Sequence, residues 1–516
     1  MRSIAQTEAI DAPALSGLGR AAARLLSAEI AAGAIIAALA FWFGVSQLLL
    51  WRFLGAFSYP VFIGAVFALL FLCVLIFRSV SRSQMRGPTL GRLLFCFAAA
   101  CLILIVGGEG RFLYANIDWH GRDAVLRDLS INDWPFAYAA RGELETLRLP
   151  IGMQLAPSLA YRFLSPEAGD IALLLQNSIL LGAALALGSL LFDTPRKRAA
   201  AFCIFVMFSG MDIIGSLIAN GRPVDHLEWW ARIQYSSHVT MLFWTPHYAI
   251  AGWLLAFLFM LNMEGKAPLG AFYVFAPLTA IWSPLTLLGI TPFAAIAGVH
   301  ALLSRRLTRT DFAVSAIAVA LSVPALLYLS AGGGSVGYRF YPIEPLRYAI
   351  FQLLEVAPFL APLAFLKPRR FGAATFLTVA IVLLAAPFVQ VGYSIDFMMR
   401  ATIPAFAILA VLVVDAINNA SRTKIIPTSL LAAALVIGAA TPVFEIARAF
   451  AFPASPRGSC SYLKARDQFF AAYPKESHIS PLDKFPAMIR PTAPALVGVE
   501  EPEKCWDGEW PRPEGV

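Results

Sequence analysis

Ionisable and aromatic residues that could do chemistry gather in a few polar segments of an otherwise apolar chain. The first segment, residues 108–168, contains NIDWHGRDAVLRDL, in which Asp118 and Arg122 are one helical turn apart. Apolar residues of this stretch fall on one side and charges on the other, and Asn116 can cap its start. We therefore predict an interfacial helix that holds Asp118 and Arg122 near lipid headgroups. The alternative is a solvated charged face on a surface helix.

The second polar segment, residues 219–239, reads NGRPVDHLEWWARIQYSSH from Asn220 and follows the motif SGMDIIG. That motif places Asp212 inside the apolar stretch 199–218, where an ionisable group is costly and is a functional candidate by default. The segment itself combines aromatic rings with donors and acceptors suited to sugars or headgroups, in Arg222, His226, Glu228, Trp229, Trp230, Tyr235 and His238. An aromatic belt at the membrane interface is the alternative for Trp229 and Trp230.

Two later segments carry arginines among aromatic residues. SVGYRFYPIEPLR contains Arg339, and GYSIDFMMRATIP contains Asp396 and Arg400. An arginine just below the outer interface can bind a phosphate with two parallel hydrogen bonds. An internal ion pair between Asp396 and Arg400, which are four residues apart, is the alternative.

A divalent metal site is a further hypothesis. His120, His226 and His238 could combine with Asp118 or Glu228, but the sequence has no closely spaced ligand motif of the kind that zinc sites use. We therefore assign no cofactor from the sequence and leave the metal hypothesis open.

The elements that position these residues follow from composition. The 516 residues are 59% hydrophobic and 14% charged, which excludes a water-soluble globular domain. Apolar stretches of roughly 20 residues recur along the chain, and lipid requires such stretches to be helical. We predict an all-α, polytopic transmembrane helical bundle of about thirteen spans. The net charge of +8 comes from short basic clusters between apolar stretches, so we expect no nucleic-acid partner.

The basic clusters also predict the topology. A cytoplasmic N-terminus places Arg78, Arg196, Arg305, Arg369 and Lys424, with their basic neighbours, on the cytoplasmic side. We predict a cytoplasmic segment 1–28, a transmembrane domain 29–445 and a periplasmic tail 446–516, in a bacterial inner membrane. The first apolar stretch is interpreted as a retained helix because no convincing cleavage site follows it. Cys460 and Cys505 both lie in the tail, where an oxidising compartment would allow a disulfide.

The order of these parts resembles the GT-C superfamily of membrane glycosyltransferases. The resemblance spans about residues 91 to 300 and is carried by IDWHGRDAVLRDL, NDWPFAY and LRLPIGMQLAPSLAYRFL. It implies a polyprenyl-phosphate-linked sugar as donor and an acidic residue of the first outer loop as general base, which falls on Asp118. The chain departs from the family in having Trp119 in place of a second carboxylate, and in an extra helix pair before the loop. FSGMDIIG, HLEWWA and DFMMRATIP also resemble segments of bacterial polytopic membrane proteins, without implying an activity.

The predicted function is transfer of a sugar, with inversion at the anomeric carbon, from a polyprenyl-phosphate donor to a glycan, lipid or protein acceptor. The reaction would take place at the periplasmic face of the membrane, whose lipid is a further predicted partner. Asp118, or Asp123 in its place, would take the acceptor proton. Arg122, Arg339 and Arg400 would neutralise the departing phosphate, and Trp229, Trp230 and Tyr235 would form a platform. We expect Asp118 to face a cavity shared with Asp212 or the 222–238 loop, and with Arg339 or Arg400. Base and arginine should lie across a sugar-sized gap and not in contact, because proton abstraction and phosphate departure occur on opposite sides of one anomeric carbon; a direct salt bridge would favour a structural role. The alternatives are a polysaccharide polymerase or ligase, and a transporter or flippase with broken helices.

Overall fold

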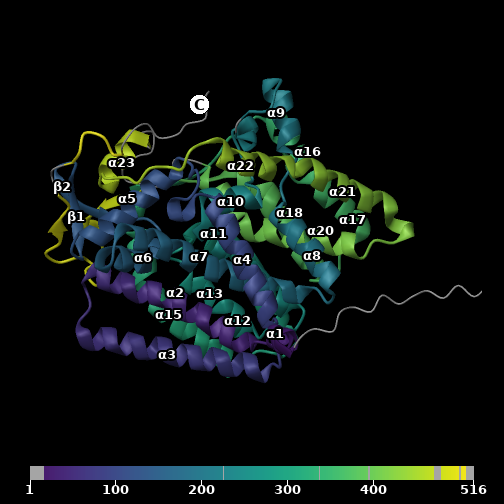
Figure 1. Cartoon of the computed structure of the whole chain (residues 1–516), viewed down its shortest axis with the longest axis horizontal. Helices are drawn as coiled ribbons and strands as arrows, with labels where there is room; N and C mark the ends of the chain where they lie inside the picture. Colours follow the sequence, from purple (N-terminus) through teal and green to yellow (C-terminus); the bar gives the residue numbers. More distant parts are fainter. Residues whose placement is uncertain are drawn as a thin grey trace, which may run out of the picture.

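The protein is a bundle of helices with two small sheets, of which strands β1 and β2 lie at one edge of the molecule (Figure 1). The computed structural model describes residues 17–224, 226–335, 337–392, 395–469, 478–498 and 501–506. Within these ranges, seven helical segments are long and apolar enough to cross a membrane. They are α2 (Ala32–Leu54), α3 (Tyr59–Arg82), α7 (Pro166–Gly188) with its short continuation to Leu191, α11 (Pro246–Met263), α14 (Pro284–Leu303), α15 (Arg309–Ser330), and α21 (Ile425–Gly438) continued by α22 (Ala440–Ala451).

The predicted apolar stretches that do not form full-length helices are short or broken. Shorter apolar helices are α4 (Leu90–Val106), α12 (Leu269–Tyr273) with α13 (Phe275–Leu278), α18 (Ala373–Ala385) and α20 (Ile403–Asn418). A pair bent by 59°, α16 (Pro345–Glu355) and α17 (Ala357–Leu366), counts as an eighth candidate span. The stretch 199–218, predicted as one helix, is divided into α8 (Pro195–Val206) and α9 (Asp212–Asn220). A multi-helix bundle with membrane-length helices is therefore confirmed.

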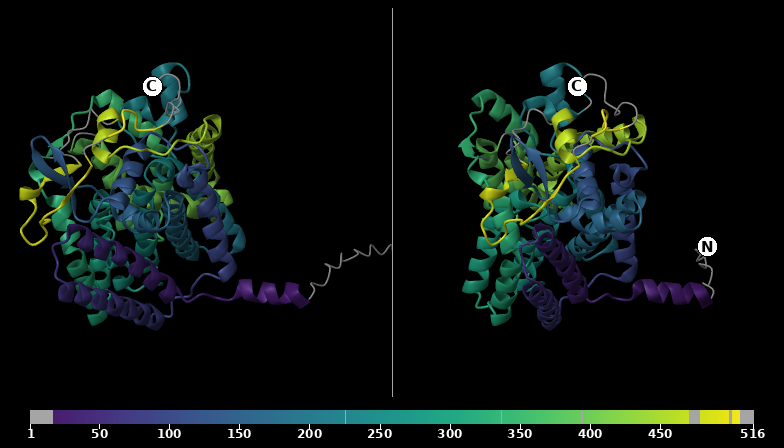
Figure 2. Two further views of the ribbon diagram at one scale, coloured as in Figure 1. Left: turned by 60° about the vertical axis from the view of Figure 1, so that its left-hand side comes forward. Right: turned by 90° about the vertical axis from the view of Figure 1, so that its left-hand side faces the viewer.

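The bundle has a buried centre and an apolar exterior. In α11, 94% of the most apolar window is buried, whereas in α3 the figure is 22%. The exposed residues of α3 include Phe67 and Phe71, as lipid contact requires. The N-terminal helix α1 (Gly17–Ser27) extends away from this bundle (Figure 2).

The first polar segment folds as predicted at its start and differently afterwards. The predicted helix is α5 (Asp118–Ile131), which begins one residue later than a cap at Asn116 would place it, because its N-cap residue is Ile117. The side chain of Asn116 accepts from the backbone N–H of Asp118 at 3.0 Å. A hairpin of β1 (Phe136–Ala140) and β2 (Glu143–Leu147) follows, and then α6 (Gly152–Phe163). A helix is thus present where it was predicted, and its location at a membrane interface stays a prediction. The β1–β2 hairpin was not predicted.

The C-terminal tail is built onto this hairpin. Its strands β5 (Ile479–Pro481) and β6 (Ala495–Leu496) flank the hairpin in a four-stranded sheet of order β5-β2-β1-β6. The tail helix α23 (Tyr462–Phe469) packs against α5, and Figure 2 shows the tail running along this side of the molecule. Cys460 and Cys505 form a disulfide with their Cα atoms 4.8 Å apart, as expected from their shared location in the tail.

The remaining elements close the polar side of the bundle. The second polar segment contains the short helices η3 (Leu227–Ala231) and α10 (His238–Trp244), and α19 (Asp396–Ala401) precedes α20. A two-stranded sheet joins β3 (Tyr338–Phe340) to β4 (Val389–Val391). These segments surround a large cavity.

Candidate functional site

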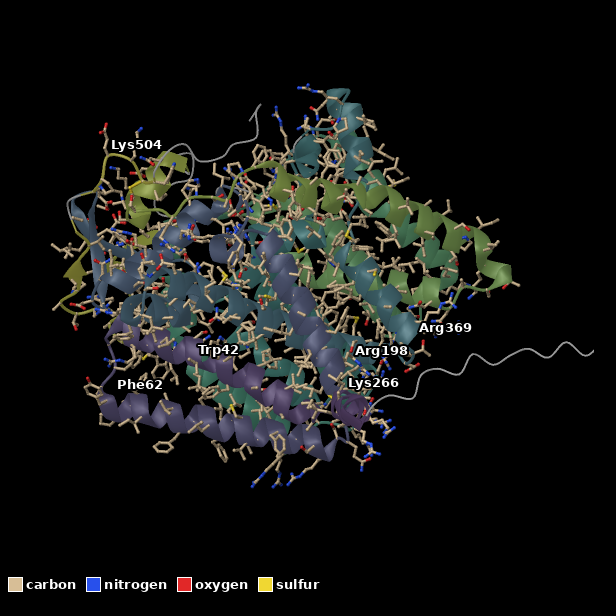
Figure 3. The ribbon with its side chains drawn as sticks, viewed as in Figure 1. Trp42, Phe62, Arg198, Lys266, Arg369 and Lys504 are labelled. Atoms are coloured by element: carbon tan, nitrogen blue, oxygen red, sulfur yellow. A yellow bond between two sulfur atoms is a disulfide. The ribbon has the colours of Figure 1, made fainter. Side chains whose placement is uncertain are left out.

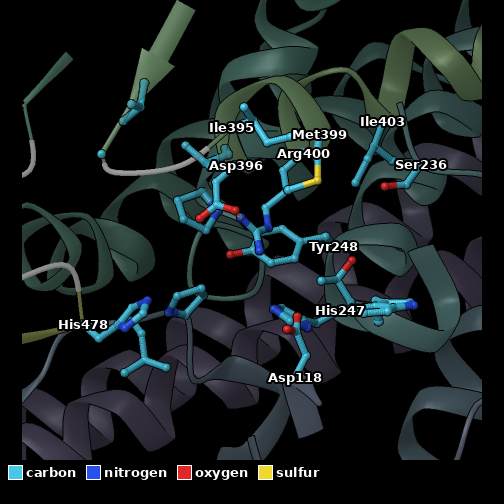
Figure 4. Close-up of a pocket in the computed structure, with 18 of the residues that line it drawn as sticks. Asp118, Ser236, His247, Tyr248, Ile395, Asp396, Met399, Arg400, Ile403 and His478 are labelled. Carbon is cyan, nitrogen blue, oxygen red and sulfur yellow. Dashed lines mark ion pairs between the residues drawn. The ribbon is translucent and has the colours of Figure 1, made fainter. Parts of the chain in front are cut away.

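A cavity of about 1270 Å³ lies where α5, the second polar segment, α11, α14, α19 and the tail meet (Figure 4). Its ionisable lining is drawn from seven separate parts of the chain: Asp118, Arg122, Arg148, His226, Glu228, Arg232, His247, Tyr248, Tyr338, Asp396, Arg400, Tyr462 and His478. The volume is large enough for a substrate bigger than a single small metabolite.

Asp118 lines this cavity from the first turn of α5. Its carboxylate is 3.1 Å from the guanidinium of Arg122, one turn further along the same helix. The Arg122 guanidinium also lies over the ring of Trp119, 5.7 Å from its centroid. In this arrangement the Asp118 carboxylate serves as an ion-pair partner, which favours the structural interpretation unless a ligand draws Arg122 away.

A second ion pair lines another part of the cavity. Asp396 and Arg400, in successive turns of α19, form the salt bridge that their spacing suggested. The Arg400 guanidinium lies 4.8 Å from the ring centroid of Tyr248. Arg400 therefore lines the cavity with Asp118, as predicted, but it also holds the internal pair that was its alternative role.

His247 and Tyr248 lie between the two ion pairs. Tyr248 interacts electrostatically with Arg400, Asp396, Arg122 and Asp118, and its ring stands between Arg400 and the Asp118 side of the cavity in Figure 4. His247 is buried and its Nδ1 has no hydrogen-bond partner among the described residues. A substrate between the two ion pairs would contact both of these side chains.

The second polar segment supplies a third part of the wall through His226, Glu228 and Trp229. His226 Nδ1 is 2.8 Å from a carboxylate oxygen of Glu445 in α22, and Glu445 also pairs with Arg448 at 2.7 Å. Glu228 accepts the backbone N–H of Ser237 at 2.7 Å. Burial raises the pKa of Glu228 well above its ordinary value, and the nearby acidic groups raise it further.

Several predicted residues lie outside the cavity because packing directs them elsewhere. Asp123 points to the other side of α5, where it pairs with Arg111 at 2.9 Å. Burial raises the pKa of Asp123 to about 6, although Arg111 acts in the opposite direction. Asp123 therefore does not share the cavity with Asp118, and its role as a substitute base has no geometric support.

Arg339 and several predicted residues of the second polar segment also do not line the cavity. Asp212 accepts from Ser209 and Thr441, and Trp230 packs at Gly215 of the same helix. The other residues of this group also lie away from the cavity lining: Arg222 is exposed, Tyr235 donates to the backbone of Leu383, His238 Nδ1 is 2.5 Å from the Phe205 carbonyl, and Arg339 donates to Gln390 at 2.8 Å. Of the predicted platform, only Trp229 lines the cavity.

The histidines proposed for a metal site lie in separate surroundings. His120 stacks near Trp506, His226 pairs with Glu445, and His238 lies among aromatic rings of the core. Among the described residues, no group of three or more histidine, cysteine, aspartate or glutamate side chains is placed to hold a metal. The metal combination suggested by the sequence is therefore not assembled.

Important cavity residues were missed by the sequence analysis. His247 and Tyr248 lie at the start of an apolar helix in the motif WTPHY, and an ionisable group in an apolar stretch was the available signal. Arg148, Tyr462 and His478 had no such signal, since they reach the cavity through the hairpin and the tail.

Comparison with protein-family models and curated proteins, and of the fold with solved structures, gives no match.

Proposed function

We propose that the protein transfers a sugar from a polyprenyl-phosphate donor to an acceptor at the outer face of the bacterial inner membrane. The observation that carries this proposal is the two-sided lining of the cavity. Asp118, Arg122 and Arg400 form charged parts of the wall, whereas Pro284, Leu285 and Leu288 of the membrane-length helix α14 form an apolar part.

The apolar wall also reaches the exterior of the bundle. The side chain of Leu288 is 54% exposed on a helix whose exterior residues suit lipid contact. A lipid-linked phosphate joins a charged head to a long apolar chain, so both halves would find matching surroundings here. A water-soluble sugar donor would have no use for the apolar wall.

The chemistry would begin with exchange of the Arg122 partner. A donor phosphate competes with Asp118 for Arg122, and binding of the phosphate would leave the carboxylate without its cation and better able to accept a proton. Asp118 would then take the proton from the acceptor hydroxyl as the acceptor oxygen bonds to the anomeric carbon. The bond from that carbon to the phosphate oxygen breaks, and its electron pair stays on the phosphate, where Arg400 and Arg122 offset the added charge.

The proposal includes the predicted topology of about thirteen spans with a cytoplasmic N-terminus and periplasmic C-terminus. Figure 3 supports the separation of the two sides but not the number of spans: Arg198, Lys266 and Arg369 lie toward one end of the molecule, whereas Phe62 and Lys504 lie toward the other. Reporter fusions after Lys424 and after Val516 should therefore report opposite compartments. Matching signals would contradict the topology.

Replacement of Asp118 tests the transferase. Asp118→Asn keeps the shape of the side chain but removes the base, so turnover with a polyprenyl-phosphate sugar should fall by about 100-fold to 10,000-fold. Donor binding and thermal unfolding should stay close to the parental values. Asp133→Asn is the matched control because Asp133 lies in the same segment with an 84% exposed side chain, outside the cavity.

Two results would contradict the assignment. Transfer by Asp118→Asn at the parental rate would exclude Asp118 as the base. Absence of transfer by the wild-type protein from a panel of polyprenyl-phosphate sugars would contradict the reaction itself.

Transport is a second candidate because two broken helices adjoin the site. The pairs α8 with α9 and α16 with α17 are both interrupted, as is common in transporters. Proteoliposomes that accumulate or flip a polar substrate without forming a glycosidic bond would favour this alternative.

A further inference from the structure

Two helix breaks meet beside the candidate site. The chain between α8 and α9 runs from Met207 to Met211, and the break between α16 and α17 falls at Val356. The backbone N–H of Met211 donates to the carbonyl of Leu354 at 3.2 Å, so the two interruptions are in direct contact. Helix α16 has 11 residues and α17 has 10, so the break at Val356 falls near the middle of the pair. It lies about 16 Å along the helix axis from Pro345.

Each break carries a buried carboxyl group. Asp212 is 2% exposed and Glu355 is 0% exposed. Asp212 accepts hydrogen bonds from Ser209 at 3.0 Å, Thr441 at 2.9 Å and Trp230 at 3.4 Å. Its carboxyl group thus has three donors and is well suited to remain charged.

Glu355 is placed differently. Its carboxyl lies against Gly210, where an added Cβ would be 1.7 Å from Oε2, and it faces the carboxyl of Asp212 within hydrogen-bonding reach. The indole N–H of Trp230, which donates to Asp212, also lies near the Glu355 carboxyl, but neither oxygen of Glu355 has a hydrogen-bond partner of normal geometry among the described residues. A fully buried acceptor pair without a donor is costly and requires an explanation.

The charges around the two groups do not compensate them. In the described part of the chain, neither Asp212 nor Glu355 forms an ion pair. The acidic Glu228 of η3 and Glu445 of α22 add negative charge nearby, and His226 and Arg448 are both engaged by Glu445. A second buried negative charge at this junction would therefore be strongly unfavourable.

We propose that Asp212 and Glu355 form a proton-binding site in which one shared proton joins the two helix breaks. The proton sits on Glu355, whose O–H donates to the Asp212 carboxylate, and Asp212 keeps its three other donors. Loss of the proton leaves two like charges in contact and drives α9 away from α16. The segment after α9 carries His226, Glu228 and Trp229, so the proton adjusts the wall of the cavity. This inference does not depend on glycosyl transfer.

Infrared spectroscopy tests the shared proton directly. The full-length protein in lipid nanodiscs, in sodium-free buffer at neutral pH, should show a carbonyl band of a neutral carboxylic acid. Glu355→Gln should lower the intensity of this carbonyl band by the contribution of one neutral carboxylic acid. Asp212→Asn should retain the band and shift it, because the charged acceptor is gone. Glu143→Gln, at an exposed position of β2, is the matched control and should leave the band unchanged.

The outcomes separate the proposal from its alternatives. Glu355→Gln resembles the neutral acid in shape, so it should fold with a thermal midpoint close to the wild-type value. If it does not fold, the shift in Asp212→Asn still provides the test. A spectrum unchanged by both variants overturns the proposal. A wild-type protein that lacks the band and gains thermal stability from sodium, with the gain lost in Glu355→Gln, also overturns it in favour of a sodium site.

Discussion

The Cys460–Cys505 disulfide should dominate the local stability of the tail that lines the cavity. The bond joins residues 45 positions apart in the sequence. In the chain-entropy description, a disulfide that closes a loop of that length lowers the entropy of the opened tail. It thereby adds about 4 kcal/mol to the free energy needed to open the tail. The double replacement Cys460→Ser with Cys505→Ser removes the link without leaving a free thiol. We expect the opening free energy of the tail to fall by up to that amount.

Hydrogen exchange read by mass spectrometry measures this opening segment by segment. A loss of about 4 kcal/mol corresponds to roughly 1,000-fold faster exchange of the protected tail amides. Peptides covering α23 should report it, since the Tyr462 N–H donates to the Asp128 carboxylate at 2.7 Å. Peptides from the buried helix α11 are the internal control and should not change.

The tail also has contacts that survive without the disulfide. Ser455 exchanges hydrogen bonds with the backbone of Ala115, both at 2.9 Å, and Arg457 pairs with Asp170 at 2.7 Å. If exchange in the double variant stays within tenfold of wild type, these contacts hold the tail and the entropy argument is refuted. Exchange accelerated equally in α11 would also refute it, because the effect would then be global.

The remaining predictions concern pH and packing. Burial raises the pKa of Asp128 to about 6, so the folded state retains this proton where the unfolded chain has lost it, and stability falls as the pH rises from about 4 to about 6. Asp128→Asn lacks this titration, so its free energy of unfolding relative to wild type should rise by about 3 kcal/mol between pH 4 and pH 6. Chemical denaturation measures this difference in unfolding free energy, and a difference that stays constant with pH would contradict the prediction. Gly289→Ala should lower the thermal midpoint, since an added Cβ would lie 1.8 Å from the backbone oxygen of Ala401 and overpacking costs about 1 to 3 kcal/mol. Gly64→Ala, where no atom lies within 4 Å of the added Cβ, is the control, and equal midpoints for the two variants would refute the packing argument.

The local features of the site were accessible from the sequence because they depend on near neighbours. The pair of Asp396 with Arg400 was the alternative suggested by helical spacing, and it forms. Asp118 was expected to lie across a gap from an arginine, but it contacts Arg122 one turn further along the same helix. The hydrogen bond from the Asp118 backbone N–H to the Asn116 side chain is also local, although the N-cap residue of α5 is Ile117 and not Asn116 as predicted. Asp118 was predicted to share a cavity with Asp212 or the 222–238 loop, and with Arg339 or Arg400. The lining contains that loop and Arg400, and it does not contain Asp212 or Arg339.

Errors arose where helix continuity was assumed from apolar length. The stretch 199–218 is apolar enough for one helix, but the chain is interrupted before Asp212. Hydropathy records the cost of exposure to water and carries little information on where a buried helix breaks. Asp212, one of two options predicted to share the cavity with Asp118, instead accepts hydrogen bonds from Ser209 and Thr441 and does not line the cavity.

By itself, the sequence determined that this chain forms a bundle of apolar helices, because burying 59% hydrophobic residues in water-excluding surroundings leaves the backbone no alternative to helical hydrogen bonds. Only the tertiary structure decided which ionisable groups meet. His226 and Glu445 are 219 residues apart, and Asp128 and Tyr462 are 334 apart, yet each pair is in hydrogen-bond contact. Such contacts depend on how helices and tail pack against one another, a long-range property that neither residue type nor local spacing encodes.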